Sequence, residues 1–365
     1  MILHFLPFKK PFQSAVPRDG FSHLPKKSKK TEAFHKKIFD SRIILSLKGS
    51  KLQKQIQKEM STTEGMITEI ERFALNDGPG IRTTVFFKGC NMNCAWCHNP
   101  ETISMKRDLH YYASKCISCY KCVYACPCKA QKRINNIHMY YPNLCVKCGK
   151  CAEICYAGAM AISGKKMTVA EVMHEVLQDK PYYLTSGGGV TLSGGEVLCQ
   201  REFAEGIVDA CHENGIKVAI ESNLNFPWEE IESFIRKLDL VMCDLKIDDS
   251  TSHRKWTGAD NTTIKASIAS LAKSGTPFIV RTPLIPGATD SNENIAAIAA
   301  FLKEVDSNGS LLYYELLNFN PLGDTKYQSL KKKNPFAEAR PLPKVRVEEL
   351  KAIAEKAGII VRAEE

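Results

Sequence analysis

The sequence predicts an α/β protein in which a mostly parallel sheet alternates with helices and is interrupted, near its start, by a cysteine-rich insertion. Of the 365 residues, 44% are hydrophobic and 25% are charged, which is enough apolar material for one large domain or two ordinary ones. Strand-like runs alternate with helical stretches from residue 67 onward, as expected for a parallel sheet with crossover helices. Twelve of the fifteen cysteines fall between Cys90 and Cys155, which indicates metal ligands and not a disulfide framework.

The expected strands are short runs rich in β-branched residues, and the expected helices carry apolar residues at helical spacing. The strands are residues 82–88, 190–193, 218–222, 240–246, 278–285 and 311–317, with a weaker run at 359–362. The helices are residues 168–178, 201–214, 228–238, 261–274, 292–304 and 347–357, and the first begins with the capping box Thr168-x-x-Glu171. Six such units predict a partial (β/α)6 TIM-like barrel. We prefer it to an open doubly wound sheet because no Gly-rich dinucleotide fingerprint follows the first strand.

Three parts of the chain differ in composition. Residues 1–60 contain 14 Lys and Arg against 4 Asp and Glu and lack sustained periodicity. We expect them to be a disordered or non-native basic extension, with a targeting or binding arm as the alternative. Residues 66–104 and 166–365 carry the barrel pattern, and residues 105–165 form the insertion.

Charge and hydropathy exclude two classes of function. Residues 61–365 hold 36 basic against 36 acidic side chains, so we expect no nucleic-acid partner. The apolar stretches are strand-sized, far below the ~20 residues that span a bilayer, and the first ten residues lack the order of a signal peptide. We therefore expect a soluble, cytoplasmic protein without a membrane partner.

Two tandem runs of four cysteines dominate the insertion. They read Cys116-x2-Cys119-x2-Cys122-x3-Cys126 and Cys145-x2-Cys148-x2-Cys151-x3-Cys155. In two-cluster ferredoxins this spacing wraps three thiolates around one [4Fe-4S] cube and sends the fourth cysteine to the other cube. The rule assigns one cluster to Cys116, Cys119, Cys122 and Cys155, and the second to Cys145, Cys148, Cys151 and Cys126. The alternative is a pair of zinc sites, and Cys128 is left without an assignment.

A third cysteine group, Cys90-x3-Cys94-x2-Cys97, follows the first expected strand and has only three thiolates. A cube held by three cysteines leaves one iron without a protein ligand, and an open coordination position is where a metal site does chemistry. His98 is an alternative fourth ligand, but it directly follows Cys97 and would have to fold back onto the same iron. We therefore expect this group to be catalytic.

The spacing of this third group, with the aromatic Trp96 before its last cysteine, resembles the signature of radical S-adenosylmethionine (SAM) enzymes. Five further motifs resemble the activating enzymes of glycyl radical enzymes. They are Asp77-Gly-Pro-Gly-Ile-Arg-Thr83, Cys97-His-Asn-Pro-Glu101, Ser193-Gly-Gly-Glu196, Asp244-Leu-Lys246 and Arg281-Thr-Pro-Leu-Ile-Pro-Gly287. The resemblance covers nearly all of residues 66–365, and the insertion is similar to that of the subgroup with a two-[4Fe-4S] ferredoxin-like domain.

The resemblance implies three [4Fe-4S] clusters and a SAM site at the carboxyl ends of the strands, where the active site of a parallel barrel lies. The open iron of the Cys90/Cys94/Cys97 cluster would be chelated by the amino and carboxylate groups of SAM. Contacts to SAM are implied for Trp96, His98, Ser193, Gly194, Gly195, Glu196, Leu245, Lys246 and Arg281. Asp244, Glu221 and Ser222, with the Met242 carbonyl, would form a monovalent-cation site. Relatives place a histidine against the adenine, where this chain offers Asn292 and Asn294 instead.

The resemblance also implies a reaction. An oxidoreductase of the [glycyl radical enzyme]-activating type (EC 1.97.1.-) cleaves SAM reductively, and the 5′-deoxyadenosyl radical removes a glycine Cα hydrogen from a partner glycyl radical enzyme. Reduced flavodoxin or ferredoxin would supply the electron in anaerobic metabolism, and we expect the protein to be a monomer. Two alternatives stay open: a radical SAM enzyme acting on a small molecule or another peptide, and a non-enzymatic iron–sulfur electron carrier.

Overall fold

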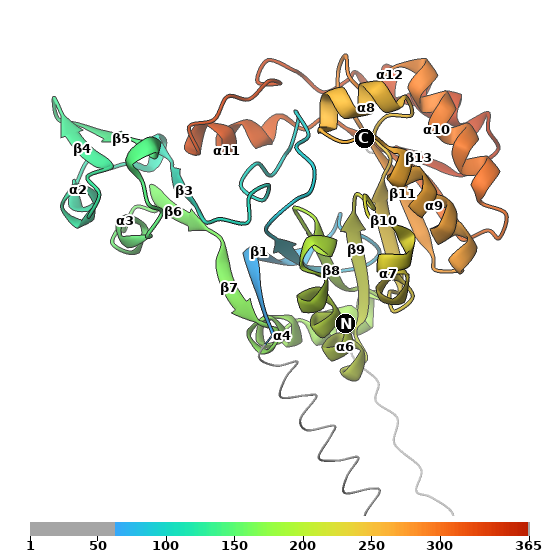
Figure 1. Ribbon diagram of the computed structural model, residues 1–365, viewed down its shortest axis with the longest axis horizontal. Helices are drawn as coiled ribbons and strands as arrows, with labels where there is room; N and C mark the ends of the chain where they lie inside the picture. Colours follow the sequence, from blue (N-terminus) through green and yellow to red (C-terminus); the bar gives the residue numbers. More distant parts are fainter. Residues whose placement is uncertain (1–62, 364–365) are drawn as a thin grey trace, which may run out of the picture. The chain divides into compact units, whose positions relative to one another are not determined.

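The computed structural model describes residues 63–363, and the extension expected at residues 1–60 lies outside the described residues. A nine-stranded sheet forms the main body, with the strand order β13-β12-β11-β10-β9-β8-β2-β1-β7 (Figure 1). Its strands are β1 (Glu64–Ala74), β2 (Arg82–Phe87), β7 (Lys165–Thr168), β8 (Gly189–Gly194), β9 (Lys217–Ser222), β10 (Leu240–Asp244), β11 (Phe278–Leu284), β12 (Leu311–Asn318) and β13 (Val361–Ala363). Within residues 63–363 no helix is long and apolar enough to cross a membrane.

Seven of these strands, β2, β8, β9, β10, β11, β12 and β13, pair in parallel and follow one another in sequence order. That order is expected for an unclosed (β/α) barrel, because a doubly wound sheet reverses its strand order at a switch point. The main connecting helices are α6 (Arg201–Glu213), α7 (Trp228–Ile235), α9 (Thr262–Ser274), α10 (Asn292–Val305) and α12 (Lys344–Glu355). The mostly parallel α/β architecture expected from the sequence is therefore confirmed.

Two antiparallel strands extend the sheet beyond the expected units. β1 pairs antiparallel with β2 on one side and with β7 on the other. β7 leads directly into α4 (Val169–Leu177), whose expected capping box is present: Glu171 N donates to Thr168 Oγ1 at 3.2 Å, and Thr168 N donates to Glu171 Oε2 at 2.8 Å. The cap satisfies two backbone donors at the helix start.

The insertion folds as a small unit of its own elements. It contains β3 (Asp108–Tyr111), α2 (Lys121–Ala125), β4 (Gln131–Ile134), β5 (Ile137–Tyr140), α3 (Lys150–Glu153) and β6 (Met160–Ser163). β3 pairs antiparallel with β6, and β4 with β5. Its core combines apolar side chains with cysteines of both runs, so the packing of this unit depends on residues that the sequence predicts to be cluster ligands.

Three shorter helices complete the described chain: α5 (Lys180–Ser186), α8 (Ser250–Thr257) and α11 (Asp324–Ser329). α11 lies against the loop that follows β2, since Lys326 Nζ donates to Asn99 Oδ1 at 2.5 Å and to Glu101 Oε1 at 2.9 Å. It also reaches the insertion, where Ser329 Oγ and His110 Nδ1 lie 2.8 Å apart. α11 therefore packs on both parts at the point where they meet.

Candidate active site at the carboxyl ends of the strands

A cavity of about 260 Å³ opens where β2, β8, β9 and β10 end. Its lining combines residues that the sequence predicted from separate motifs: Cys90, Cys94, Trp96, Cys97, His98, Ser193, Gly194, Gly195, Glu221, Ser222, Asp244 and Lys246. The same cavity is also lined by Met92, Asn99, Asn223, Pro283 and Leu317. Polar groups from the ends of β8, β9 and β10 and from the loop after β2 therefore face a single space.

The cysteine loop is held in place by backbone hydrogen bonds to two neighbouring segments. Asn93 N donates to the Thr257 carbonyl and Ala95 N to the Trp256 carbonyl, both at 2.9 Å, at the end of α8. On the other side, Glu196 N donates to the Gly89 carbonyl at 2.8 Å. The three cysteines are thus presented by a loop tied to two rigid elements.

Gly194 and Gly195 have no side chains, and this lets the backbone before the cysteine loop pack directly against the end of β8. A Cβ at Gly194 would lie 2.3 Å from the Phe87 carbonyl oxygen, and one at Gly195 would lie 2.3 Å from the Gly89 carbonyl oxygen. Gly194 also has φ of +110°, a conformation that side-chain-bearing residues rarely adopt. The two glycines therefore bring the end of β8 against the backbone that carries Cys90.

Burial makes this a site for neutral thiols unless positive charge is bound there. It raises the pKa of the Cys90 and Cys97 thiols to about 12, and that of Cys94 in the same direction. Thiolates that bind iron need a compensating cation, which the iron itself supplies. The donor set, three half-buried thiols that line one cavity, fits a cluster with one iron left to a small ligand.

No three His, Cys, Asp or Glu side chains in residues 63–363 converge as ligands of one metal ion. This finding bears on mononuclear sites, because in a four-iron cube each thiolate binds a different iron and the sulfurs surround the cluster instead of meeting at a point. Two donors lie near Cys90 Sγ: Met92 N at 3.4 Å and Asn223 Nδ2 at 3.9 Å, and the latter also donates to Asn91 Oδ1 at 2.9 Å.

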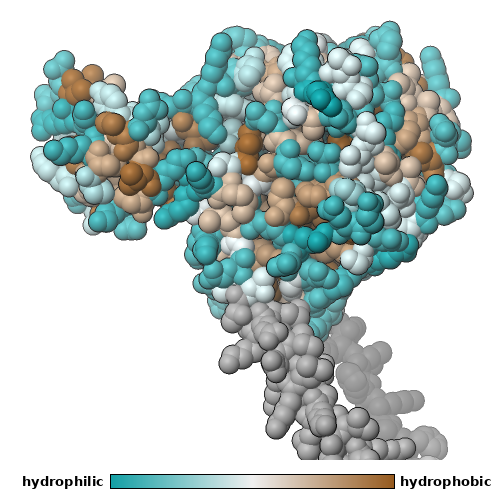
Figure 2. Space-filling model, in the orientation of Figure 1, coloured by the Kyte–Doolittle hydropathy of each residue, from teal (hydrophilic) through white to brown (hydrophobic). Residues whose placement is uncertain are grey.

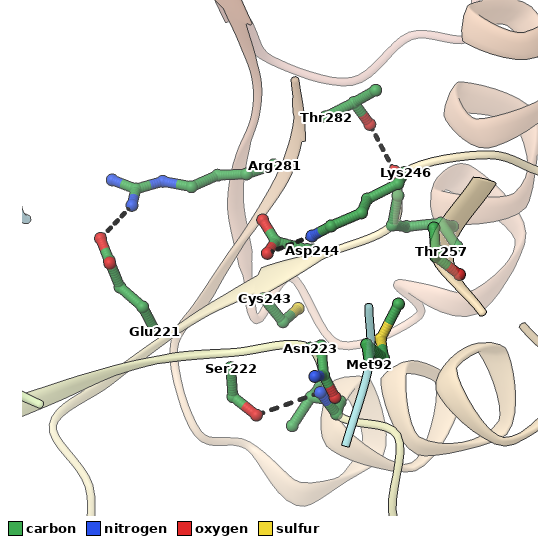
Figure 3. Close-up of polar contacts among 12 residues, drawn as sticks. Met92, Glu221, Ser222, Asn223, Cys243, Asp244, Lys246, Thr257, Arg281 and Thr282 are labelled. Carbon is green, nitrogen blue, oxygen red and sulfur yellow. Dashed lines mark hydrogen bonds and ion pairs between the residues drawn. The ribbon is translucent and has the colours of Figure 1, made fainter. Parts of the chain in front are cut away.

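Ion pairs lie side by side at this end of the sheet, and Figure 3 shows two of them, Lys246–Asp244 and Arg281–Glu221. Lys246 Nζ lies 2.5 Å from Asp244 Oδ2. Burial alone would lower the pKa of Lys246, but the Asp244 carboxylate raises it, so the ammonium stays charged. Arg281 contacts Glu221 through Nη1 at 2.5 Å and Glu315 through Nε at 2.7 Å.

These pairs bear on the expected monovalent-cation site. The carboxylates of Asp244 and Glu221 are already neutralised by Lys246 and Arg281, and Ser193 Oγ donates to Glu221 as well. An added cation would therefore compete with an internal one for each carboxylate.

Three predicted contact residues do not line this cavity. Leu245 is fully buried in the hydrophobic core, and its carbonyl accepts a hydrogen bond from Thr282 Oγ1. Arg281 lines an adjoining cavity of about 620 Å³ instead, which shares Trp96, His98, Glu221 and Asp244 with the first. Glu196 is completely buried behind the wall.

Glu196 joins the ends of β8 and β9. Its carboxylate accepts hydrogen bonds from Leu198 N at 3.0 Å, Asn223 N at 2.8 Å and Ser222 Oγ at 2.8 Å. Burial raises the pKa of Glu196 to about 7 against these hydrogen bonds. The residue therefore acts by positioning Ser222 and Asn223, which do line the cavity.

Because its folded-state pKa is raised, Glu196 binds more protons in the folded than in the unfolded protein, and stability is lost as pH rises from 4.5 towards about 7. A shift of this size corresponds to about 3 kcal/mol across that window. We expect Glu196→Gln to flatten this part of the curve of unfolding free energy against pH, measured by urea unfolding under anaerobic conditions. The exposed Glu202→Gln is the control, and an unchanged slope in E196Q would contradict the assignment.

Of the two residues offered for adenine contact, Asn292 is exposed at the start of α10, whereas Asn294 is held by hydrogen bonds. The Asn294 side chain is engaged three times: Oδ1 accepts from Asp248 N at 2.8 Å, and Nδ2 donates to the carbonyls of Lys246 at 3.2 Å and Thr289 at 2.8 Å. It joins the loop after β10 to the loop after β11 and has no group left for a ligand. Asn294 is therefore a structural residue of these loops.

Comparison with known proteins identifies the family. A model of the radical SAM superfamily matches residues 143–299. A solved domain of pyruvate-formate lyase-activating enzyme from Bacteroides vulgatus is 26% identical, with a TM-score of 0.42 over 49% of this chain and all of that one. The (2S)-3-sulfopropanediol dehydratase activating enzyme of Klebsiella oxytoca is 36% identical over 73% of this chain and 85% of its own. The benzylsuccinate synthase activating enzyme of Thauera aromatica is 39% identical over 73% of this chain and 81% of its own. The chain belongs to the activating enzymes of glycyl radical enzymes, in the radical SAM superfamily. Membership implies one [4Fe-4S] cluster and SAM as its substrate.

The insertion of this activating enzyme brings its cysteines together across the two runs. One pocket is lined by Cys116, Cys119, Cys122 and Cys155, which we call the first set. Burial and the neighbouring thiols of Cys116, Cys155 and Cys119 together raise the pKa of Cys122 to about 11. In the second run, burial and then the thiols of Cys145 and Cys126 raise the pKa of Cys151 to about 12. We call Cys126, Cys145, Cys148 and Cys151 the second set.

Two buried polar side chains lie between the sets. His138 Nε2 lies 3.4 Å from Cys122 Sγ and 2.8 Å from Gln131 Oε1. Gln131 Nε2 in turn donates to Cys151 Sγ at 3.9 Å. Cys128 adjoins the second set, with its Sγ 3.7 Å from that of Cys126.

The carboxylate of Asp108 connects the insertion to the segment that leads into Cys90. Asp108 Oδ1 accepts from Lys147 Nζ at 2.7 Å, and Asp108 Oδ2 accepts from Lys88 Nζ at 2.9 Å. Lys88 is fully buried, immediately precedes Gly89 and Cys90, and also donates to the Glu101 carbonyl. Lys147 lies between two cysteines of the second set.

Several lining residues were missing from the predicted site. They include Asn223, Met92 and Leu317. These residue types are common in cores and turns, so the residue type alone does not predict a place in the site. Asn223 was the most accessible to sequence reasoning, because it directly follows Ser222 at a strand end. Pro283, in the motif that starts at Arg281, lines both cavities, whereas Arg281 lines only the adjoining one.

Proposed function

We propose that this activating enzyme binds a [4Fe-4S] cluster through Cys90, Cys94 and Cys97, with SAM beside it. When bound, the cluster and SAM supply a one-electron cleavage whose carbon radical can take a hydrogen atom from a glycine Cα of a partner enzyme. The observation that carries the proposal is that three half-buried thiols, the Gly194-Gly195 backbone and the Lys246 ammonium line one cavity.

The protein's own part is to bind, orient and exclude water. Lys246, kept charged by Asp244, can meet a ligand carboxylate, and Ser193 with the backbone of Gly194 and Gly195 can face its ammonium group. Trp96 belongs to a small apolar cluster with Ile285 and Phe319, which keeps one side of the cavity dry. Such a wall protects a reactive intermediate from water.

We further propose a domain division into a barrel (residues 66–104 and 166–365) and a ferredoxin-like insertion (residues 105–165) with two more [4Fe-4S] clusters on the first and second sets. The lining of one pocket by the four first-set cysteines supports this proposal. Flavodoxin or ferredoxin would donate the electron, and the protein would act as a monomer. The adjoining cavity, lined by Arg281, Asp77 and Asn320, is where the partner's glycine segment would enter.

The decisive experiment mixes the reconstituted protein with SAM, a reductant and each candidate glycyl radical enzyme encoded beside its gene. We expect a glycyl radical by electron paramagnetic resonance (EPR) in one mixture and one 5′-deoxyadenosine per radical. Cleavage of SAM without a glycyl signal from any candidate would favour a small-molecule radical enzyme. Iron and sulfide without cleavage would favour an electron carrier.

A second experiment tests the role of the insertion. We expect the double variant Cys119→Ala/Cys148→Ala to keep SAM binding and dithionite-driven cleavage, because neither residue lines the catalytic cavity. With reduced flavodoxin, multiple turnovers should fall at least about tenfold, since each remaining set has lost one thiolate. Cys128→Ala is the control. Unchanged flavodoxin-driven turnover in the double variant would show that the insertion is no relay.

A further inference from the structure

The positive charge of the folded chain is concentrated in the insertion. Residues 105–165 carry ten Lys and Arg against two Asp and Glu, whereas the rest of residues 61–365 carries 26 against 34. The electrical balance of residues 61–365 therefore hides two opposite halves, +8 and −8. A field of this strength on a small unit attracts oppositely charged partners from a distance.

These cations are not neutralised by carboxylates. In the described chain, Lys147 is the only one of the ten with an ion-pair partner, Asp108. Four others lie over tyrosine rings at 4.4 to 5.0 Å from the ring centroid: Lys115 over Tyr112, Lys121 over Tyr156, Lys132 over Tyr141 and Arg133 over Tyr120. We call these eight residues the lysine–tyrosine face. A cation–π contact orders a side chain and leaves its charge available to a partner.

The lysine–tyrosine face adjoins the first cysteine set. Tyr120 and Lys121 line the same pocket as Cys119, an exposed cysteine of that set. Large apolar side chains are exposed around it, with Tyr156 at 88% and Ile117 at 69%. Figure 2 shows such brown patches between teal side chains on the part of the surface that holds α2, α3, β4 and β5. Aromatic and apolar contacts inside a charged rim are typical of protein interfaces.

We propose that the lysine–tyrosine face docks an acidic one-electron carrier protein. The proposal rests on the proposed function, in which the insertion relays electrons. The carrier is oxidised by one electron and the activating enzyme is reduced by one, with no bond formed or broken between them. Charge complementarity brings the carrier in, and the exposed edge at Cys119 gives it the shortest approach to the first set.

A nucleic acid is a less suitable occupant. Proteins that bind single strands stack bases on free aromatic faces, and here one of the protein's own cations already lies over each of the four tyrosine rings. The partner glycyl radical enzyme is also less suitable, because its glycine must reach the cavity beside Cys94 and not the insertion.

The test uses the full chain with its clusters reconstituted and reduced flavodoxin as the probe. In the triple variant Lys115→Glu/Lys121→Glu/Lys132→Glu, we expect the second-order rate constant of reduction at low ionic strength to fall at least about tenfold. Its dependence on salt should weaken as well. The matched control is Lys273→Glu/Lys303→Glu/Lys356→Glu, the same charge change at exposed lysines of the barrel, which should stay within about twofold of the native rate constant.

Iron content and dithionite reduction should be the same in all three proteins, so that loss of folding is detected separately. A triple K-to-E variant reduced by flavodoxin at the native rate would overturn the proposal. Loss of binding to the glycyl radical enzyme, or to a single-stranded oligonucleotide, with unchanged flavodoxin kinetics would also overturn it. Failure of the native protein to cleave SAM even with dithionite would contradict the proposed function instead. The rates of reduction by flavodoxin would still test whether this face is the docking surface.

Discussion

Replacing Cys94 by alanine is expected to abolish SAM cleavage, a loss of at least about a thousandfold and the largest effect of any single change proposed for this protein. Cys94 is one of only three thiols that face the cavity, so its loss leaves a cube with two protein ligands. The measurement is 5′-deoxyadenosine formed with dithionite as reductant, which bypasses any role of the insertion.

The control is Cys199→Ala, because Cys199 is exposed and does not line the cavity. Mössbauer spectra of the two proteins separate the outcomes: C94A should lose one cluster of the native complement, and C199A none. A C94A protein that still cleaves SAM at more than a small fraction of the native rate would show that the catalytic cluster lies elsewhere.

The second large effect is expected at Arg281, in stability. Arg281 is 8% exposed and is the cation between Glu221 and Glu315. Arg281→Met would leave both carboxylates without a partner in a mostly buried place, at a cost of about 3–5 kcal/mol in the free energy of unfolding. Urea unfolding of the holoprotein measures this directly.

The pH dependence of that loss has a definite sign. Burial already raises the pKa of Glu221, while Arg281 lowers it. Without Arg281 the folded state holds its proton to higher pH, so the variant binds more protons folded than unfolded and loses stability as pH rises above about 4.5. Arg236→Met, which removes an exposed pair with Glu232, is the control and should cost less than about 1 kcal/mol. Equal losses in the two variants, or a loss in R281M that is independent of pH, would contradict this account.

Sequence reasoning located the parallel strands because short runs rich in β-branched residues, such as 278–284, are typical of buried strands. It missed β1, whose Thr, Glu and Arg residues read as loop, since its outer part is exposed and the strand is defined by pairing on both sides. It also missed α8, whose buried residues are His253 and Thr257 and not an apolar stripe. His253 is ordered by a contact of 2.6 Å from Nδ1 to the Ala259 carbonyl, which no periodicity reveals.

The same division holds within the site. Cys90, Cys94 and Cys97 were recognisable because their spacing has few other uses. The different roles of Glu196 and Glu221 could not be predicted, because both are carboxylates at strand ends. Only the fold shows that Glu221 faces the cavity and that Glu196 turns back to three donors from its neighbours. Likewise, Gly194 and Gly195 are explained by their contacts with the backbone of Phe87 and Gly89, which lie about a hundred residues earlier in the chain.

Asp108 has a consequence for how reliably charge could cross between the two parts of the molecule. Tunnelling rates decay exponentially with separation, so a loosely hinged lobe would transfer electrons only in rare compact moments. The Asp108 carboxylate forms ion pairs with Lys88 before the cysteine loop and with Lys147 in the insertion, which restrains the distance between the two parts. In the proposed relay, the electron-transfer distance would then be set by the fold and would vary little with thermal motion.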